Sequence, residues 1–127
     1  MPRVLVVEDY ADAREMYVNF LEHNGMEVVQ APDGLTALAH LSAGRPDVVV
    51  LDINLPQLDG IEVLRRIRGD PETVNIPVIV VSAGIRDSLT CTPLVTGATL
   101  AFAKPLLPED LLAAVLRVLP APPGTPA

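Results

Sequence analysis

The stretch Val48-Val49-Val50-Leu51-Asp52-Ile53-Asn54-Leu55-Pro56 decides how this chain folds. Its first four residues are apolar and mostly β-branched, which is typical of a strand buried on both faces in a parallel sheet covered by helices. An acid, Asp52, follows this run directly. The carboxyl ends of strands are where open α/β sheets hold their ligands. Because burying an unpaired charge there is costly, we expect Asp52 to meet a cation or to take part in a reaction.

Similar apolar runs alternate along the chain with helical patterns. The predicted strands are Val4–Val7, Met26–Val29, Val48–Leu51, Pro77–Val81 and Leu100–Ala103. Apolar residues at three- and four-residue spacing predict the helices between them. Their expected core faces are Ala13, Met16, Tyr17, Phe20 and Leu21; Leu35, Leu38 and Leu41; Ile61, Leu64 and Ile67; and Leu111, Leu112, Val115, Leu116 and Leu119.

Punctuating residues mark the expected ends of these helices. Asp33-Gly34 and Asp59-Gly60 precede the second and third helices, and Pro108 suits the first turn of the last one. Gly25 and Gly44 follow the first and second helices as stop signals. Repeated strand–helix units with two-faced strands predict a doubly wound parallel α/β sheet.

The chain is expected to hold one domain, residues 1–119, followed by a Pro-rich tail or linker start at 120–127. One part of the domain is ambiguous. The segment Ser88–Ala103 contains no charged residue, and Pro93 falls where a fourth helix should run. Either a short helix begins near Thr92-Pro93, or the region is irregular.

Composition narrows the classes of function. Half of the 127 residues are hydrophobic but only 3% are aromatic, so the core must be aliphatic. A net charge of −7 disfavours direct binding to nucleic acid or to an anionic membrane. The single cysteine, Cys91, excludes an internal disulfide. No apolar stretch has the length of a membrane span or of a signal-peptide core, so we expect a soluble, cytoplasmic protein.

Polar side chains collect at the carboxyl ends of the predicted strands. Glu8 and Asp9 end the first strand, Asp52 ends the third, Ser82 follows the fourth and Lys104 follows the fifth. Crowded carboxylates need a cation, since two unit charges 4 Å apart repel by roughly 4 kcal/mol at an effective dielectric near 20. Oxygen ligands suit Mg²⁺ or Mn²⁺ rather than zinc. A carboxylate can also accept a phosphoryl group, with Mg²⁺, Lys104 and Ser82 neutralising its charge.

Taken together, these residues resemble the receiver domain of two-component response regulators, in particular stand-alone receivers of the chemotaxis-regulator type. The resemblance spans residues 3–119. It implies a flavodoxin-like fold with strand order 2-1-3-4-5 and helices on both faces. It also implies a phosphorelay signalling protein that is not an enzyme beyond its own phosphorylation and slow dephosphorylation. The motifs that carry the resemblance are Glu8-Asp9, Asp52, Pro56 with Asp59-Gly60, Ser82-Ala83, Gly97-Ala98 and Lys104-Pro105.

The resemblance further implies a role for each site residue. Asp52 would be the phosphoacceptor, and the donor would be a histidine kinase or a phosphotransfer protein. Asp9, Asp52 and the backbone carbonyl of Asn54 would ligate Mg²⁺, with Glu8 acting through water. The residues expected to contact the phosphoryl group are Ser82 as the switch hydroxyl, Ala83 and Lys104. The Lys104–Pro105 peptide bond is expected to be cis.

The chain departs from the family at Ala101, three residues before Lys104, where receivers usually carry a Tyr or Phe that reports phosphorylation to partners. The neighbouring Phe102 should point to the opposite face of its strand. We therefore expect signalling to rely on displacement of Ser82 and its loop, or on oligomerisation. The uncharged segment Ser88–Ala103 predicts a hydrophobic contact, either a homodimer or a docking surface for a downstream protein.

Three other functions compete with this interpretation. A receiver-fold interaction or dimerisation module would act with little or no phosphorylation, but its site acids would then have to be missing, and they are present. A phosphatase of the haloacid dehalogenase type also forms an aspartyl phosphate, but it needs a second Asp where this chain has Asn54, and a cap domain for which the chain is too short. A flavin or nucleotide carrier on this fold would need a Gly-rich loop after the first strand.

Overall fold

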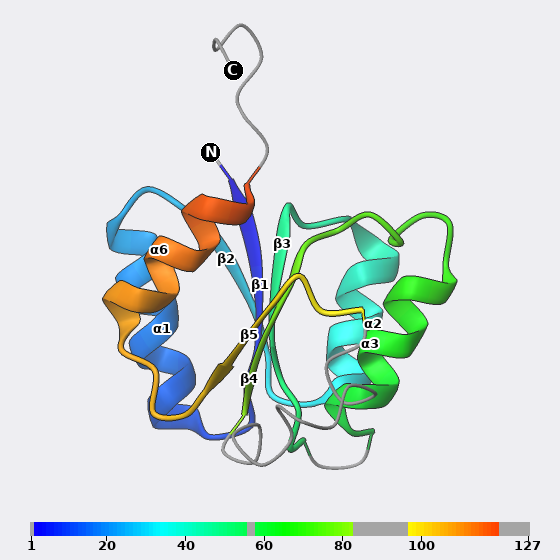
Figure 1. The fold of residues 1–127 in the computed structure, drawn as a ribbon, viewed down its shortest axis with the longest axis horizontal. Coiled ribbons are helices and arrows are strands. Elements are labelled where there is room, and N and C mark those ends of the chain that lie inside the picture. The colour runs from blue at the N-terminus through cyan, green and yellow to red at the C-terminus, as the bar shows by residue number, and fades with distance from the viewer. Residues whose placement is uncertain (1, 56–57, 83–96, 120–127) are drawn as a thin grey trace, which may run out of the picture.

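The chain forms a parallel β-sheet between two layers of helices (Figure 1). The computed structural model describes residues 2–55, 58–82 and 97–119. The strand order is β2-β1-β3-β4-β5, with every neighbouring pair parallel, which confirms the expected doubly wound topology. The elements are β1 (Arg3–Val7), α1 (Ala11–His23), β2 (Glu27–Ala31), α2 (Gly34–Ala43), β3 (Val48–Asp52), α3 (Gly60–Gly69), β4 (Val78–Ser82), β5 (Leu100–Ala103) and α6 (Pro108–Val118).

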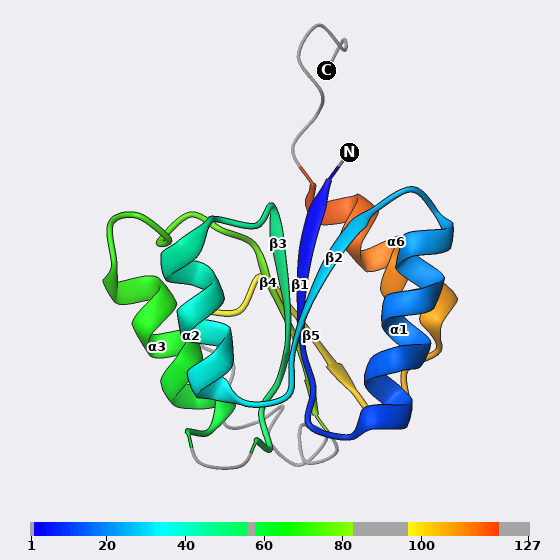
Figure 2. The ribbon, with the colours of Figure 1, turned by 180° about the vertical axis from the view of Figure 1, so that it is seen from behind.

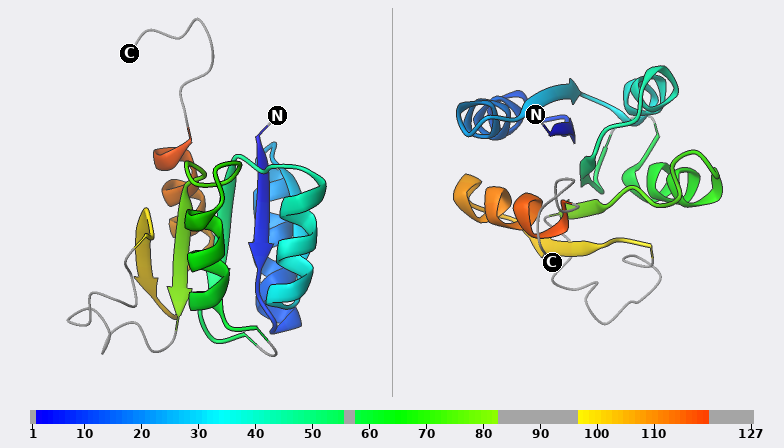
Figure 3. Two further views of the ribbon diagram at one scale, coloured as in Figure 1. Left: turned by 90° about the vertical axis from the view of Figure 1, so that its right-hand side faces the viewer. Right: turned by 90° about the horizontal axis from the view of Figure 1, so that it is seen from above.

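The central strands are buried on both faces because successive side chains enter two different cores. Leu5 and Val7 pack into the core under α2 and α3, whereas Val4 and Val6 pack into the core under α1 and α6. Figure 2 shows the two helix pairs on opposite sides of the sheet, and Figure 3 shows the same layers from the side and from above. All five residues of β3 are buried, which confirms the prediction of a strand that is buried on both faces.

The helix ends follow the local signals in the sequence. Asp33 caps α2 by accepting a hydrogen bond from the Thr36 N–H at 2.7 Å. Asp59 caps α3 by accepting one from the Glu62 N–H at 3.0 Å. Gly25 follows α1 with a φ of +89°, a left-handed conformation that favours glycine. These caps satisfy backbone groups that a helix end leaves without partners.

Three apolar residues assigned to helix core faces are instead exposed. Met16, Leu35 and Leu116 are 43%, 54% and 57% exposed. In α2 two of the buried positions are small residues, Gly34 and Ala37, and a Cβ on Gly34 would lie only 2.4 Å from the Leu58 carbonyl oxygen. Leucine periodicity therefore located the apolar side of α2 but not its centre, which small residues occupy. The buried helix positions that the pattern missed are Val18, Gly34, Ala37, Gly60, Val63 and Ala114.

Several predictions fall on residues that the structure does not describe. The ambiguous start of a fourth helix near Thr92-Pro93, the motif residue Pro56 and the tail at 120–127 lie outside the described residues. Among the helices that are described, none is long and apolar enough to cross a membrane.

Candidate functional site

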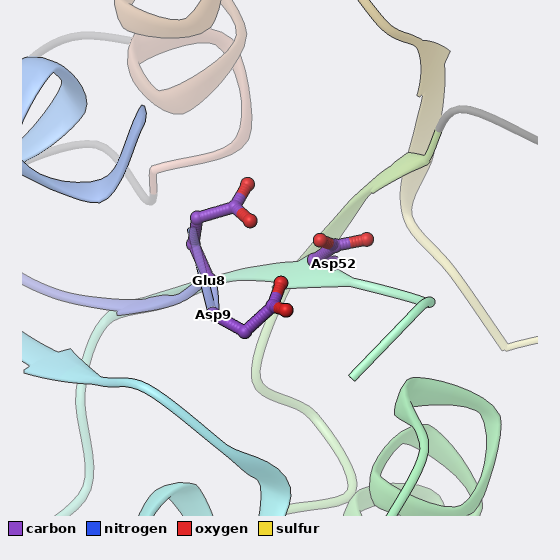
Figure 4. A group of neighbouring side chains, drawn as sticks. All are labelled: Glu8, Asp9 and Asp52. Carbon is purple, nitrogen blue, oxygen red and sulfur yellow. The ribbon is translucent and has the colours of Figure 1, made fainter. Parts of the chain in front are cut away.

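Strand register brings the predicted acids together at one edge of the sheet, the lower edge in Figure 1. Strands β1 and β3 are neighbours, and Val7 pairs with Leu51. Glu8 and Asp9 therefore leave β1 at the level where β3 ends in Asp52. Figure 4 shows the three carboxylates grouped there. One oxygen from each lies within 4.8 Å of the others, although the three residues come from two separate segments of chain.

Lys104 bridges two of these acids. Its Nζ lies 2.6 Å from Glu8 Oε1 and 3.1 Å from Asp52 Oδ2. Both carboxylates are almost fully buried, with side chains 4% and 5% exposed, and the Lys104 side chain is 24% exposed. Burying these acids without a cation would be costly, and the ammonium group offsets that cost. The contact between Glu8 and Lys104 was not predicted from the sequence.

The charge of Lys104 is favoured by this environment. Burial lowers the pKa of Lys104, but hydrogen bonds and charge attraction from Glu8 and Asp52 outweigh that effect and raise the pKa above its ordinary value. With Asp9 included, the cluster sets three carboxyl groups against one ammonium group. The carboxylates at this edge therefore outnumber the ammonium group, and a further cation would balance the excess negative charge.

Backbone contacts fix the orientation of Asp52. Its Oδ1 accepts a hydrogen bond from the Asn54 N–H at 3.0 Å. Gly60 opens α3 directly against this turn: its N–H donates to the Ile53 carbonyl at 2.9 Å, and a Cβ at this position would lie 2.3 Å from the Asp52 carbonyl oxygen. Asp59 thus caps α3, which is the role expected from its sequence, and Gly60 is in addition a close-packing point that the sequence did not predict.

The segment that carries Glu8 is also fastened. Arg14 of α1 donates from Nη1 to the Glu8 carbonyl oxygen at 2.9 Å and from Nε to Gln30 Oε1 at 3.1 Å. The Glu8 N–H donates to the Ala31 carbonyl at 3.0 Å. These contacts tie the end of β1 to α1 and to β2. Nothing in the sequence pattern singled out Arg14.

The donor set fits a hard divalent cation. Glu8, Asp9 and Asp52 are the only group of three or more His, Cys, Asp or Glu side chains among the described residues that could jointly hold a metal ion. All three offer carboxylate oxygen, the ligand type that Mg²⁺ prefers. Asp9 is exposed, so one side of the cluster faces solvent. A closed set of thiolate or imidazole ligands, as in structural zinc sites, is not what these residues provide.

The remaining predicted residues fall at the same edge or outside the described part of the chain. Ser82 ends β4, where its backbone pairs with Ala103 of β5. Ala83 lies outside the described residues. The Lys104–Pro105 peptide bond is cis, the isomer expected from the resemblance.

The departure at the aromatic position is visible in the packing of β5. Ala101 packs against the core under α2 and α3, and Phe102 packs against the core under α1 and α6. The two side chains therefore point to opposite faces of the strand, as alternation predicted. No aromatic side chain occupies the Ala101 position.

Sequence reasoning also missed Tyr17, which it assigned only to the apolar face of α1. The Tyr17 hydroxyl donates to the Leu106 carbonyl at 2.8 Å within the buried layer between α1 and α6. Burial raises the pKa of Tyr17, Lys104 partly opposes this, and Glu8 and Asp52 add to it. The hydroxyl is therefore within electrostatic reach of the charged cluster. A tyrosine on an apolar stripe was the available signal, because a buried hydroxyl needs a partner.

Comparison with known sequences places this edge in a family context. The chain matches the model of the response regulator receiver domain over residues 4–116. It is 40% identical over 119 residues to the response regulator MprA of Mycobacterium tuberculosis. It is 36% identical over 117 residues to the phosphate regulon transcriptional regulatory protein PhoB of Escherichia coli. Each alignment covers 92% of this chain but only 50% and 51% of those proteins, so the chain spans about half the length of these curated relatives.

Comparison with solved structures agrees. The chemotaxis response regulator CheY4 of Vibrio cholerae matches with a TM-score of 0.84 at 32% identity, covering 94% of this chain and 99% of that one. The receiver domain of the Francisella response regulator 1452 matches with a TM-score of 0.84 at 30% identity, covering 93% and 96%. Because the family model matches residues 4–116 of the 127, the chain belongs to the receiver domain family of two-component response regulators.

Proposed function

We propose that Asp52 is the phosphoacceptor of this receiver domain. One observation carries the proposal: a buried carboxylate at the end of the central strand β3, held between the Asn54 N–H and the Lys104 ammonium group. A buried acid that is oriented by two donors on a covered strand has no evident role in packing. Its position at the carboxyl edge of an open parallel sheet is where this architecture places chemistry.

The proposed reaction is transfer of a phosphoryl group from a phosphohistidine. An Asp52 oxygen forms the new bond to phosphorus, the phosphorus–nitrogen bond breaks, and its electron pair leaves with the imidazole. The structure favours this chemistry because the nucleophile is already oriented and largely shielded from water. Lys104 lies 3.1 Å from Asp52 and can contact the phosphoryl oxygens once they arrive. Ser82 and Ala83 are proposed as further contacts, since they follow the neighbouring strand.

Mg²⁺ is the proposed partner of the acidic cluster. Asp9, Asp52 and the backbone carbonyl of Asn54 would hold the ion, with Glu8 contributing through water. When bound, Mg²⁺ supplies positive charge to the oxygens of the transferred group. Mn²⁺ offers the same preference for oxygen ligands. Lys104 contacts both Glu8 and Asp52, so we expect the contacts of Lys104 to change when the ion binds.

The phosphodonor is proposed to be a histidine kinase or a phosphotransfer protein, and the output a change in binding to a downstream protein. Ala101 cannot rotate between states as an aromatic side chain can. We propose that the signal instead passes through the loop after Ser82 or through contacts of the uncharged segment Ser88–Ala103, including a homodimer. The described part of that segment, Gly97–Ala103, is partly buried at most positions.

Intact mass measurement tests the central assignment. The protein is incubated with Mg²⁺ and acetyl phosphate, and we expect it to gain the mass of one phosphoryl group, while Asp52→Asn gains none. Asp59→Asn is the matched control, because this exposed acid caps α3 and Asn is an equally good cap. It should gain the same mass as the native protein. No gain in the native protein, or an equal gain in Asp52→Asn, would overturn the proposal.

A further inference from the structure

Tyr17 makes a buried hydrogen bond between two elements that both lead to the site. The residue is 4% exposed on α1, and its hydroxyl donates to the Leu106 carbonyl oxygen at 2.8 Å. Leu106 is itself buried and follows Lys104 by two residues. The hydrogen bond therefore anchors the short connection between β5 and α6, which carries the only lysine of the chain.

Contacts from α1 reach both segments of chain that meet in the charged cluster. At its start, α1 is separated from Glu8 and Asp9 by Tyr10 alone, and Arg14 donates to the Glu8 carbonyl at 2.9 Å. One helical turn later, Tyr17 holds Leu106. Lys104 joins the two segments through its 2.6 Å contact to Glu8. One helix thus contacts the two segments that carry the partners of the Glu8–Lys104 ion pair.

Lysine needs such anchoring more than most side chains, since four rotatable bonds separate its ammonium group from the backbone. Lys104 sits just after the end of β5, where ladder hydrogen bonds no longer hold the chain. A shift of the backbone at this point would move the ammonium group away from Asp52. The raised pKa of Tyr17 keeps its hydroxyl protonated, so it remains a donor across the working pH range.

We propose that Tyr17 is a positioning residue for Lys104, and that it acts by fixing the Leu106 carbonyl through its hydroxyl. The kinetic consequence rests on the proposed function of Asp52, but the structural consequence does not. Tyr17 also contributes its ring to the core between α1 and α6, so the two contributions must be separated experimentally. Tyr17→Phe does this because it keeps the ring and removes only the hydroxyl.

Nuclear magnetic resonance of protein labelled with ¹³C in lysine tests the structural part. Lys104 is the only lysine, so its Cε gives a single side-chain signal. A fixed side chain should show two distinct shifts for the ε-methylene protons, and in Tyr17→Phe we expect them to merge. The matched control is Tyr10→Phe, which changes the other tyrosine of the chain, 63% exposed. An unchanged Lys104 signal in folded Tyr17→Phe would overturn the proposal.

Phosphorylation rates with acetyl phosphate test the kinetic part. We expect Tyr17→Phe to react about three- to tenfold more slowly, the effect of losing one neutral hydrogen bond, and Tyr10→Phe to react at the native rate. In a Lys104→Met background, Tyr17→Phe should cause no further loss, because there is no ammonium group left to position. An equal loss in both backgrounds would indicate a general packing effect and overturn the proposal. If the native protein took up no phosphoryl group, the proposed function would fail, and the lysine signals would still decide the role of Tyr17.

Discussion

The parallel strands begin at one edge of the sheet, the amino edge, and end at the other, the carboxyl edge. Each edge holds a partly buried cation, but the partners of one cation are charged and those of the other are neutral. At the carboxyl edge, Lys104 contacts the carboxylates of Glu8 and Asp52. At the amino edge, the acceptors of Arg68 of α3 among the described residues are all neutral oxygens. Those acceptors are the carbonyls of Gly97 at 2.6 Å, Ile76 at 2.7 Å and Val74 at 3.0 Å, and Thr99 Oγ1 at 3.5 Å.

The difference between these partners separates a cation with a structural role, Arg68, from Lys104, for which we propose a functional role. Burial lowers the pKa of Arg68, whereas the carboxylates around Lys104 raise its pKa overall. The planar guanidinium group satisfies several carbonyls at once and closes the end of the fold. The Lys104 cluster keeps more carboxylates than cations. An edge with unbalanced charge can respond to a metal ion or a phosphoryl group, and an edge of satisfied neutral contacts cannot.

The largest expected effect follows removal of the cation from the carboxyl edge. Lys104→Met leaves Glu8 and Asp52 buried without their ammonium partner, so the free energy of unfolding without divalent ions should fall by about 3 kcal/mol. Adding Mg²⁺ should stabilise this variant more than the native protein, because the ion replaces the missing charge. Chemical denaturation with and without Mg²⁺ measures both effects. Equal stabilisation of the two proteins would contradict the charge argument.

The pH dependence of unfolding stability in the same variant tests whether the Lys104 ion pair stabilises the fold. A raised pKa means that the ammonium group of Lys104 contributes its full stabilisation below its ordinary pKa of 10.5, and that this contribution disappears as the pH rises through the folded-state value. The native protein should therefore lose stability at alkaline pH more steeply than Lys104→Met does. Parallel stability curves for the two proteins above pH 9 would show that the ion pair makes no net contribution.

Removing the cation at the amino edge should destabilise the fold and leave phosphorylation unchanged. Arg68→Met leaves several carbonyls without a donor, and we expect a loss of about 2–3 kcal/mol in unfolding free energy. Unlike the lysine variant, it should gain no extra stability from Mg²⁺ and should keep the native extent of phosphorylation. Arg117→Met, an exposed arginine in the last turn of α6, is the control and should change stability little. If Mg²⁺ restored the stability of Arg68→Met, the proposed difference between the two edges would be contradicted.

A smaller effect should follow from crowding the backbone at the carboxyl edge. Gly60→Ala places a Cβ 2.3 Å from the Asp52 carbonyl oxygen, so α3 or the Asp52 turn must move, at a cost of about 1–3 kcal/mol. Gly69→Ala is the matched control on the same helix, since its Cβ would meet no atom within 4 Å. That substitution should be neutral or slightly stabilising. Similar melting temperatures for both variants would show that the close approach is not needed.

The smallest effect belongs to charges that lie on neither edge. Glu62 pairs with Arg65 and Arg66 on the exposed face of α3, and hydrogen bonds from these arginines lower the pKa of Glu62 to about 2. The small stabilisation from this carboxylate is present above its ordinary pKa of 4.5 and is lost as the pH falls towards 2. Glu62→Gln should therefore differ slightly from the native protein at neutral pH and low salt only. A difference that persists in high salt would argue for a packing role.

Much of the fold and part of the site could be predicted because the physics is local or periodic. The apolar run before Asp52 identified a two-faced strand, and Asp33 and Asp59 identified helix starts. Leu35 was misplaced because apolar spacing does not reveal which residue must be small enough for close packing at Gly34. The Glu8–Lys104 contact was missed because a pairing between residues 96 positions apart depends on side-chain reach across the sheet.

The order of strands and helices, the parallel sheet and the set of acids at its carboxyl edge all follow from the amino-acid sequence. Apolar runs alternate with helical patterns along the chain, and parallel strands end together. The partners of the charged and polar groups depend on how the chain packs: Lys104 lies between Glu8 and Asp52, Arg68 lies among neutral carbonyls, and Tyr17 contacts Leu106. The reason is that charge balance and hydrogen bonding in a buried site are set by distances of a few ångströms between remote segments, and packing alone fixes those distances.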